Sequence, residues 1–91
     1  MLFMVIERLP DPAAVYARFR EKGRQAPPGL DYVDSWVDLS GTRCFQLMRC
    51  DDAKLMLEWV AAWQDLGSFE VIPVVTSKEA ASVFNREDAK P

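Results

Sequence analysis

The sequence contains no histidine and only two cysteines among its 91 residues. Histidine is the commonest general base and the commonest metal ligand, so its absence removes the usual routes to both kinds of chemistry. We therefore expect no metal site and no cofactor. Cys44 and Cys50 fall in one expected strand, which separates them by roughly 20 Å, well beyond the span of about 4.4 to 6.8 Å that a disulfide bridges. We expect both to be buried free thiols.

Concentrated positive charge and long apolar runs are also missing. Basic residues number 11 and acidic residues 14, which gives a net charge of -3. The basic cluster between Arg18 and Arg24 is broken by Glu21, so we expect a solvated helix face and no nucleic-acid partner. No apolar run approaches the roughly 20 residues of a membrane span. The opening MLFMVI lacks a basic leader and a cleavage pattern, so we expect no signal peptide, no membrane association and a cytoplasmic location.

The residues that are present predict one domain over residues 1–84, followed by a polar, flexible tail over 85–91. The apolar run Met1 to Arg8 predicts a buried strand. Asp11 and Pro12 then provide the N-cap and first turn of a short amphipathic helix that ends at Gly23.

A hairpin is predicted next, because Leu30–Leu39 and Arg43–Cys50 flank the pair Ser40-Gly41. With a two-residue turn, the ladder pairs Leu39 with Thr42, Asp38 with Arg43, Trp36 with Phe45, Ser35 with Gln46 and Asp34 with Leu47. One face then carries Tyr32, Asp34, Trp36, Asp38, Arg43, Phe45, Leu47 and Arg49. The other face carries Val33, Ser35, Val37, Cys44, Gln46, Met48 and Cys50. A longer loop would shift these pairs.

The second half of the chain predicts a helix, a strand and a final helix. Asp51 or Asp52 caps a helix that runs to about Leu66, with Trp59 and Trp63 on its core face and Gly67 at its end. The strand Phe69–Val75 contains Pro73, which places it at a sheet edge. Thr76 and Glu79 form a capping box for a short helix that ends near Phe84.

This order is β-α-β-β-α-β with an appended helix, which predicts a ferredoxin-like α+β fold. Its four-stranded antiparallel sheet carries two helices on one face and leaves the other face open. The first and fourth strands are apolar on both faces, so we expect the open face to be covered. A second copy, giving a homodimer, is the preferred cover. The alternative is that the C-terminal helix folds back over the open face.

Several segments together resemble a family of short bacterial proteins known only as a domain of unknown function. They are MLFMVIE, YVDSW, RCFQLM followed by CDD, the residues Glu58, Trp59 and Trp63, and VIPVVTSKEA. The resemblance covers Met1 to about Ala81. It implies a dimeric α/β-barrel, in which two sheets pack together, and it implies no activity.

The candidate site lies on the hairpin face that carries Asp34, which we expect to be the open one because the less charged face with Gln46 is the better surface for helix packing. Tyr32, Asp34, Trp36 and Arg43 combine aromatic surface with a few charges, as expected of a pocket for a small hydrophobic or aromatic ligand. Asp34 among apolar neighbours is the candidate general base, although it could instead pair with Arg43 or Arg49, or lie in solvent. Gln46 is a further candidate contact, with Ser35 as its expected partner. Glu7 and Glu70 are expected to be rim charges.

Three functions remain open from the sequence. The preferred one is a homodimeric small-molecule-binding domain with a pocket at the sheet face. The second is a cofactor-independent isomerase or monooxygenase that uses Asp34 as its base. The third is a structural or interaction dimer whose barrel is filled by side chains.

Overall fold

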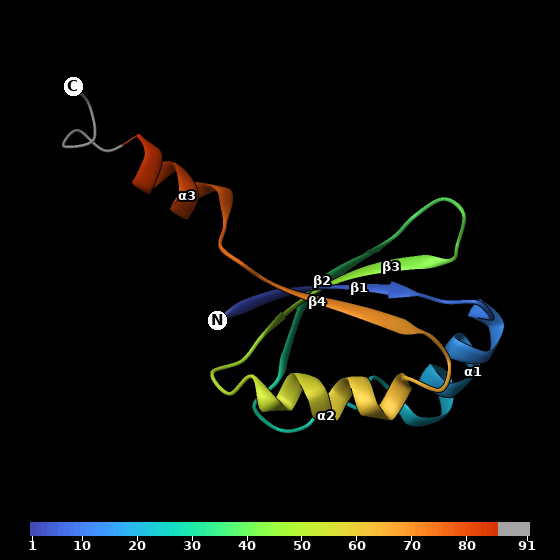
Figure 1. Cartoon of the computed structure of the whole chain (residues 1–91). Coiled ribbons are helices and arrows are strands. Elements are labelled where there is room, and N and C mark those ends of the chain that lie inside the picture. Colours follow the sequence, from blue (N-terminus) through green and yellow to red (C-terminus); the bar gives the residue numbers. More distant parts are fainter. Residues whose placement is uncertain (86–91) are drawn as a thin grey trace.

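The computed structural model describes residues 1–85, which form four strands and three helices (Figure 1). In chain order the elements are β1 (Leu2–Arg8), α1 (Pro12–Lys22), β2 (Asp31–Val37), β3 (Arg43–Arg49), α2 (Lys54–Trp63), β4 (Ser68–Val74) and α3 (Ser77–Phe84). This order confirms the ferredoxin-like α+β fold. Most of the predicted tail over 85–91 lies outside the described residues. No helix in the described part of the chain is long and apolar enough to cross a membrane.

The four strands form one antiparallel sheet in the order β2-β3-β1-β4. β1 therefore lies in the interior of the sheet, paired with β3 on one side and β4 on the other. β4 is an edge strand, as its proline predicts, because Pro73 has no N–H to give to a second neighbour.

Both α1 and α2 cover one face of the sheet, and the opposite face carries no helix (Figure 1). The core lies between α2 and the sheet and includes Phe3, Val5, Met48 and Trp59. The indole N–H groups of Trp59 and Trp63 both donate to the backbone carbonyl of Arg24, at 2.9 and 2.8 Å. These two bonds attach α2 to the loop that follows α1 and confirm that both tryptophans are core residues.

The hairpin has the predicted register but a wider turn. Trp36 pairs with Phe45, and Asp34 pairs with Leu47, as expected. Asp38 and Arg43 form the last hydrogen-bonded pair of the ladder, and residues 39–42 form the loop. The expected Leu39–Thr42 pair is therefore not part of the ladder. A bulge between Tyr32 and Asp34 shifts the register. Tyr32 consequently lies on the helix-covered face, which corrects its predicted place beside Asp34 and Trp36.

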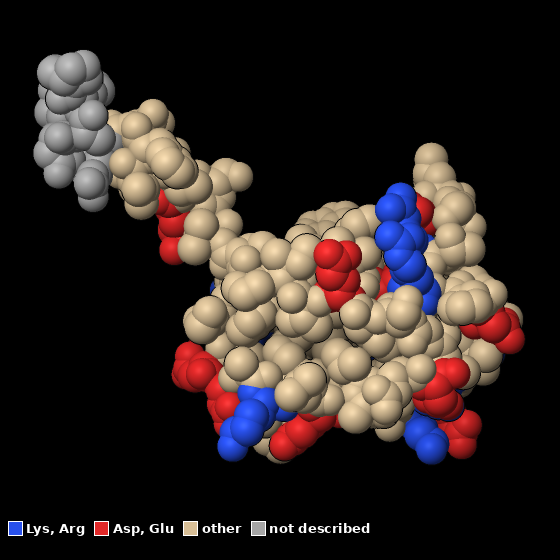
Figure 2. Space-filling view, viewed as in Figure 1, with Lys and Arg blue, Asp and Glu red and all other residues tan. Residues whose placement is uncertain are grey.

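The face opposite the helices, here called the open face, carries the side chains of Met4, Ile6, Leu47 and Phe45 in adjacent positions of the ladder. Figure 2 shows charged side chains along the lower side of the molecule, formed by α1 and α2, and a further basic ridge with acidic neighbours on its upper side. α3 projects away from the sheet and does not fold back over the open face (Figure 1). The alternative in which this helix covers the face from within the same chain is therefore wrong.

Candidate functional site

The structure divides the five predicted ligand contacts between the two faces of the sheet. Asp34, Trp36 and Arg43 lie on the open face, whereas Tyr32 and Gln46 lie on the face covered by helices. The bulge in β2 accounts for Tyr32, because one extra residue in a strand moves the preceding side chain to the other face. Gln46 lies on the face opposite Asp34 and Trp36, as the predicted register requires. The two groups cannot line one pocket within a single chain.

The three open-face residues do not converge on a common point. Asp34 is exposed and accepts a hydrogen bond from the backbone N–H of Ser35 at 2.8 Å. Arg43 instead pairs with Asp38, through Nε and Oδ2 at 2.8 Å. Hydrogen bonds from Ser40 and Arg43 lower the pKa of Asp38 to about 2, which keeps this carboxylate ionised in the hairpin loop.

A cavity of about 150 Å³ lies between α1 and the helix-covered face of the sheet. We call it the α1 cavity. Its lining residues come from β1, α1, β2, β3 and the adjoining loops, and they are Glu7, Leu9, Val15, Tyr16, Phe19, Arg24, Ser35, Val37, Cys44 and Gln46. Tyr16, Phe19 and Val37 are each between 43% and 46% exposed, so the cavity opens to solvent beside them.

Two buried polar side chains, Glu7 and Gln46, meet in this cavity. They are only 6% and 8% exposed, and Gln46 Nε2 donates to Glu7 Oε1 at 2.8 Å. Burial raises the pKa of Glu7, while the hydrogen bond from Gln46, that from Cys44 and the charge of Arg24 act in the opposite direction. Glu7 is therefore a buried carboxyl group, and its prediction as a rim charge is wrong.

The position of Glu7 follows from the strand period. Phe3, Val5 and Glu7 alternate onto the same face of β1, so the apolar pattern that buries the first two also places Glu7 under α1. The partner strand brings Cys44 opposite Glu7, and Gln46 opposite Val5. The strand period indicates which face carries Glu7, but the sequence does not show that α1 extends over this end of the strand and buries it.

Cys44 is a neutral thiol in this environment. Burial, followed by the charge of Glu7, raises the pKa of Cys44 to about 12. Because the thiolate is the nucleophilic form of cysteine, Cys44 is suited to packing and weak hydrogen bonding rather than to nucleophilic chemistry. Both cysteines are free, as predicted, but only Cys50 is buried, whereas Cys44 is half-buried beside the cavity.

Arg24 forms a side of the cavity with its guanidinium between two aromatic rings. Its Cζ lies 3.7 Å from the ring centroid of Tyr32 and 5.2 Å from that of Phe19. The Tyr32 hydroxyl is 2.7 Å from Ser35 Oγ, which holds the Tyr32 ring across the end of β2. Stacking between aromatic rings fixes the plane of the guanidinium and reduces its freedom to seek other partners.

Two buried polar atoms of the α1 cavity residues have no hydrogen-bond partner within residues 1–85: Gln46 Oε1 and Arg24 Nε. A buried polar atom without a partner costs about 1 to 3 kcal/mol, so native proteins seldom retain one without a reason. One of these atoms is an acceptor and the other is a donor. A molecule that presents a donor beside an acceptor has the chemistry to satisfy both.

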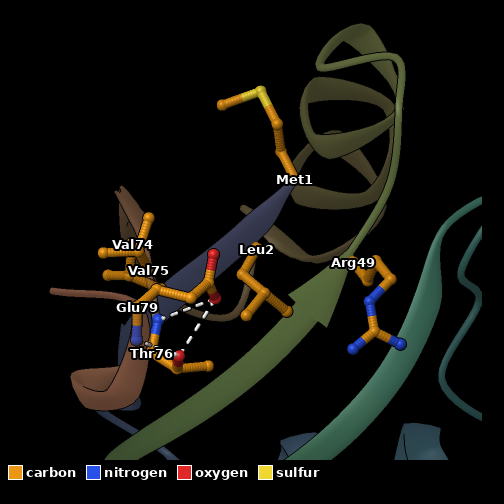
Figure 3. Close-up of a pocket in the computed structure, with 7 residues that line it drawn as sticks. All are labelled: Met1, Leu2, Arg49, Val74, Val75, Thr76 and Glu79. Atoms are coloured by element: carbon orange, nitrogen blue, oxygen red, sulfur yellow. Dashed lines mark hydrogen bonds between the residues drawn. The ribbon is translucent and has the colours of Figure 1, made fainter. Parts of the chain in front are cut away.

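A larger hollow, of about 410 Å³, lies where α3 leaves the sheet (Figure 3). It is lined by Met1, Leu2, Arg49, Val74, Val75, Thr76 and Glu79. The Glu79 carboxylate is already held by the Thr76 backbone N–H and hydroxyl, as the predicted capping box requires. This hollow therefore offers mainly apolar surface beside Arg49, and the α1 cavity is the stronger candidate for ligand binding. Among the described residues, no group of three or more cysteine, aspartate or glutamate side chains is placed to hold a metal ion.

Comparison with known proteins gives one match. The model of the family described as "Domain of unknown function (DUF3303)" matches residues 1–88. No curated protein and no solved structure matches the chain.

Proposed function

Starting from the fact that the chain belongs to the DUF3303 family, we propose that it is a small-molecule-binding domain whose binding site is the α1 cavity. The observation that supports this proposal is the pair of unpartnered polar atoms, Gln46 Oε1 and Arg24 Nε, on residues that line the same cavity. The proposal moves the predicted pocket from the open face to the helix-covered face and keeps Gln46 and Tyr32 at or beside it.

The chemistry of the cavity favours a small, neutral ligand with an apolar body and a carboxamide group. A carboxamide offers an N–H to Gln46 Oε1 and a carbonyl oxygen to Arg24 Nε. Glu7 disfavours an anionic ligand and Arg24 disfavours a cationic one. A cavity of about 150 Å³ is known to hold a single benzene ring, and this cavity also opens to solvent, so benzamide is a suitable probe that combines one such ring with a carboxamide.

The test measures thermal unfolding of the full chain with benzamide, benzoate and benzylamine as probes. Benzamide at about ten times its Kd raises the free energy of unfolding by about 1.4 kcal/mol, and the two charged probes give smaller changes. Replacing Gln46 by leucine abolishes the benzamide effect because it removes the acceptor. The matched control Gln64→Leu, at an exposed position after α2, leaves that effect unchanged.

The proposal fails if none of the three probes changes the unfolding temperature. It also fails if Gln46→Leu and Gln64→Leu respond equally to benzamide.

A second candidate function is proton transfer catalysed without a cofactor, and the buried carboxyl group of Glu7 favours it. A base with a raised pKa in an apolar cavity is suited to removing a proton from carbon, as an isomerase does. The test follows exchange of the methyl protons of acetophenone for solvent deuterium. This function requires that Glu7→Gln abolish the exchange and that Asp34→Asn retain it. If only Asp34→Asn abolishes the exchange, Asp34 and not Glu7 is the general base.

The proposal includes the bacterial and cytoplasmic setting expected from the sequence and from the family resemblance. Fractionation of the source cells tests the compartment. A homodimer formed through the open face is also part of the proposal.

A further inference from the structure

Within residues 1–85, α3 has no packing partner. None of its residues is buried, and its two last apolar side chains, Val83 and Phe84, are 52% and 82% exposed. Val75, in the segment that leads to it, is 63% exposed. Figure 1 shows the helix standing away from the sheet at the end of this extended segment. Ala80, Val83 and Phe84 follow helical spacing and form one apolar stripe.

A helix of this length is not stable when it stands alone. It has eight residues, whereas isolated helices shorter than about 12 to 15 residues are marginal in water. Yet its start is fixed by a complete capping box between Thr76 and Glu79. The projecting helix also gives the molecule a radius of gyration of 15.9 Å, against about 12 Å for a compact chain of this length. These features are typical of an arm that packs on another molecule.

The open face provides a surface with the layout of an interface. Its centre is formed by Met4, Ile6, Leu47 and Ile72, which are neighbours in the ladder. The charged residues of this face lie around that centre, at strand ends or on the edge strands: Arg8, Asp31, Asp34, Arg43, Arg49 and Glu70. An apolar centre with a polar rim is the arrangement found in protein interfaces.

Counted by its footprint, the open face alone falls below the usual size of a stable interface, and α3 adds to it. Four strands of seven residues cover about 440 Å² per copy, or about 880 Å² for two copies, while stable interfaces bury about 1,200 to 2,000 Å². One side of α3 offers about 190 Å² and would cover a similar area of a partner. Two arms raise the buried area to about 1,600 Å², which is the standard size of a stable interface.

We propose that α3 is an arm that packs against the second copy of this chain, an inference that rests on the proposed homodimer in which the two copies meet through their open faces. The second copy is the occupant because the face and the arm belong to the same chain, and together they reach the area that a dimer needs. In a dimer with a two-fold axis, the open face and the apolar stripe of α3 each form a contact in both copies, so neither surface is left in solvent. The hollow at the base of α3 includes Leu2, Arg49 and Val74, whose side chains lie on the open face beside this interface (Figure 3).

The first test measures the mass of the full chain and its variants by analytical ultracentrifugation over a concentration series. The wild type sediments as a dimer, at twice 10.4 kDa. Leu47→Lys, at the centre of the open face, sediments as a monomer. Phe84→Lys weakens the dimer by roughly tenfold or more in Kd, because it removes an apolar anchor of the arm. The matched control Leu57→Lys, 71% exposed on α2, remains dimeric.

The second test measures amide hydrogen exchange in α3, since a docked helix is protected and a free one is not. Protection is expected in the wild type and is lost in the Leu47→Lys monomer. If Leu47→Lys does not fold, Trp36→Lys replaces it, because Trp36 is 51% exposed and tolerates a charged side chain better.

Three results would overturn the proposal: a monomeric wild type, a dimer that Phe84→Lys leaves unchanged, or protection of α3 that persists in the monomeric variant. The last result would show that the arm packs on its own chain. None of these results depends on ligand binding in the α1 cavity.

Discussion

Glu7 is the side chain whose environment differs most from what its type suggests. A carboxylate near a strand end is usually solvated, but this one is 6% exposed and hydrogen-bonded to Gln46. Its burial costs folding free energy, because the ionised form loses the hydration that it has in the unfolded chain. Such a cost is retained most readily where the group serves binding or catalysis.

The first prediction concerns the stability of Glu7→Gln. The glutamine keeps an oxygen to accept from Gln46 Nε2 and gains an N–H for the unpartnered Gln46 Oε1. It also removes a buried charge, so the free energy of unfolding at pH 7 increases by about 1 to 3 kcal/mol. Urea unfolding measures this change, and Glu70→Gln on the edge strand serves as a control that leaves stability nearly unchanged. A destabilised Glu7→Gln would contradict this account of the cavity.

The pH dependence of stability has a sign that follows from the same group. The folded-state pKa of Glu7 is raised above its ordinary value of 4.5, so the folded protein binds this proton more tightly than the unfolded chain. The contribution of Glu7 to stability is therefore complete below pH 4.5 and is lost as the pH rises through the raised pKa. The free energy of unfolding of the wild type minus that of Glu7→Gln should therefore decrease as the pH rises from 4 to 8. A difference that increases with pH would mean that the folded-state pKa is lowered.

A further prediction at the residue scale concerns the thiols. Burial raises the pKa of both cysteines, that of Cys44 to about 12, so both are protonated at neutral pH. Both thiols should react slowly with Ellman's reagent in the native protein, because they are protonated, and at once in denaturant. A fast reaction in the native state would show that Cys44 is activated rather than inert.

The sequence identifies some of these residues and misses others. Gln46 is recognisable because a mid-strand amide between Cys44 and Met48 needs a partner, but the partner expected was Ser35. The actual partner, Glu7, is 39 residues away in sequence. Its burial depends on α1 and β3 together, so single-strand patterns do not reveal it.

Among the elements, the cross-strand side-chain pairs of the hairpin predict its register better than the Ser40-Gly41 pair predicts its turn. Opposite charges at Asp38 and Arg43 and aromatic rings at Trp36 and Phe45 fix the hairpin register, which the structure confirms. The wider turn and the bulge beside Tyr32 were not predicted. Bulges have no strong sequence signal, because an extra residue in one strand disturbs only local geometry.

Gly67 gives the prediction at this scale. It was expected to end a helix, but α2 ends at Trp63, and Gly67 does not have the positive φ of Gly23 and Gly41. Its role is close approach: a Cβ there would collide with the backbone carbonyl oxygen of Arg8. Gly67→Ala should therefore lower the free energy of unfolding by about 1 to 3 kcal/mol, while Ser68→Ala at the next, exposed position has little effect. Equal stability of both variants would show that the turn can move away from β1.

At the scale of the whole molecule, the order of elements is enough to predict the fold, because few ways exist to connect a β-α-β-β-α-β chain into one sheet. The faces are also predictable, since the less charged hairpin face was assigned to the helices and lies there. The cavity is not predictable, because its shape depends on how α1 sits above β1 and β3. The direction of α3 is not predictable either, because nothing in its sequence distinguishes packing on its own chain from packing on another.

The central claim is that the α1 cavity, and not the open face, binds the ligand, and the indole N–H signals of the three tryptophans test it directly. Trp59 and Trp63 donate to the backbone carbonyl of Arg24, and Arg24 is one of the residues that line the cavity. Trp36 lies on the open face. In a two-dimensional nitrogen–proton NMR titration with benzamide, the signals of Trp59 and Trp63 should shift and saturate while that of Trp36 stays in place. A titration that moves only Trp36, or none of the three, would contradict the claim.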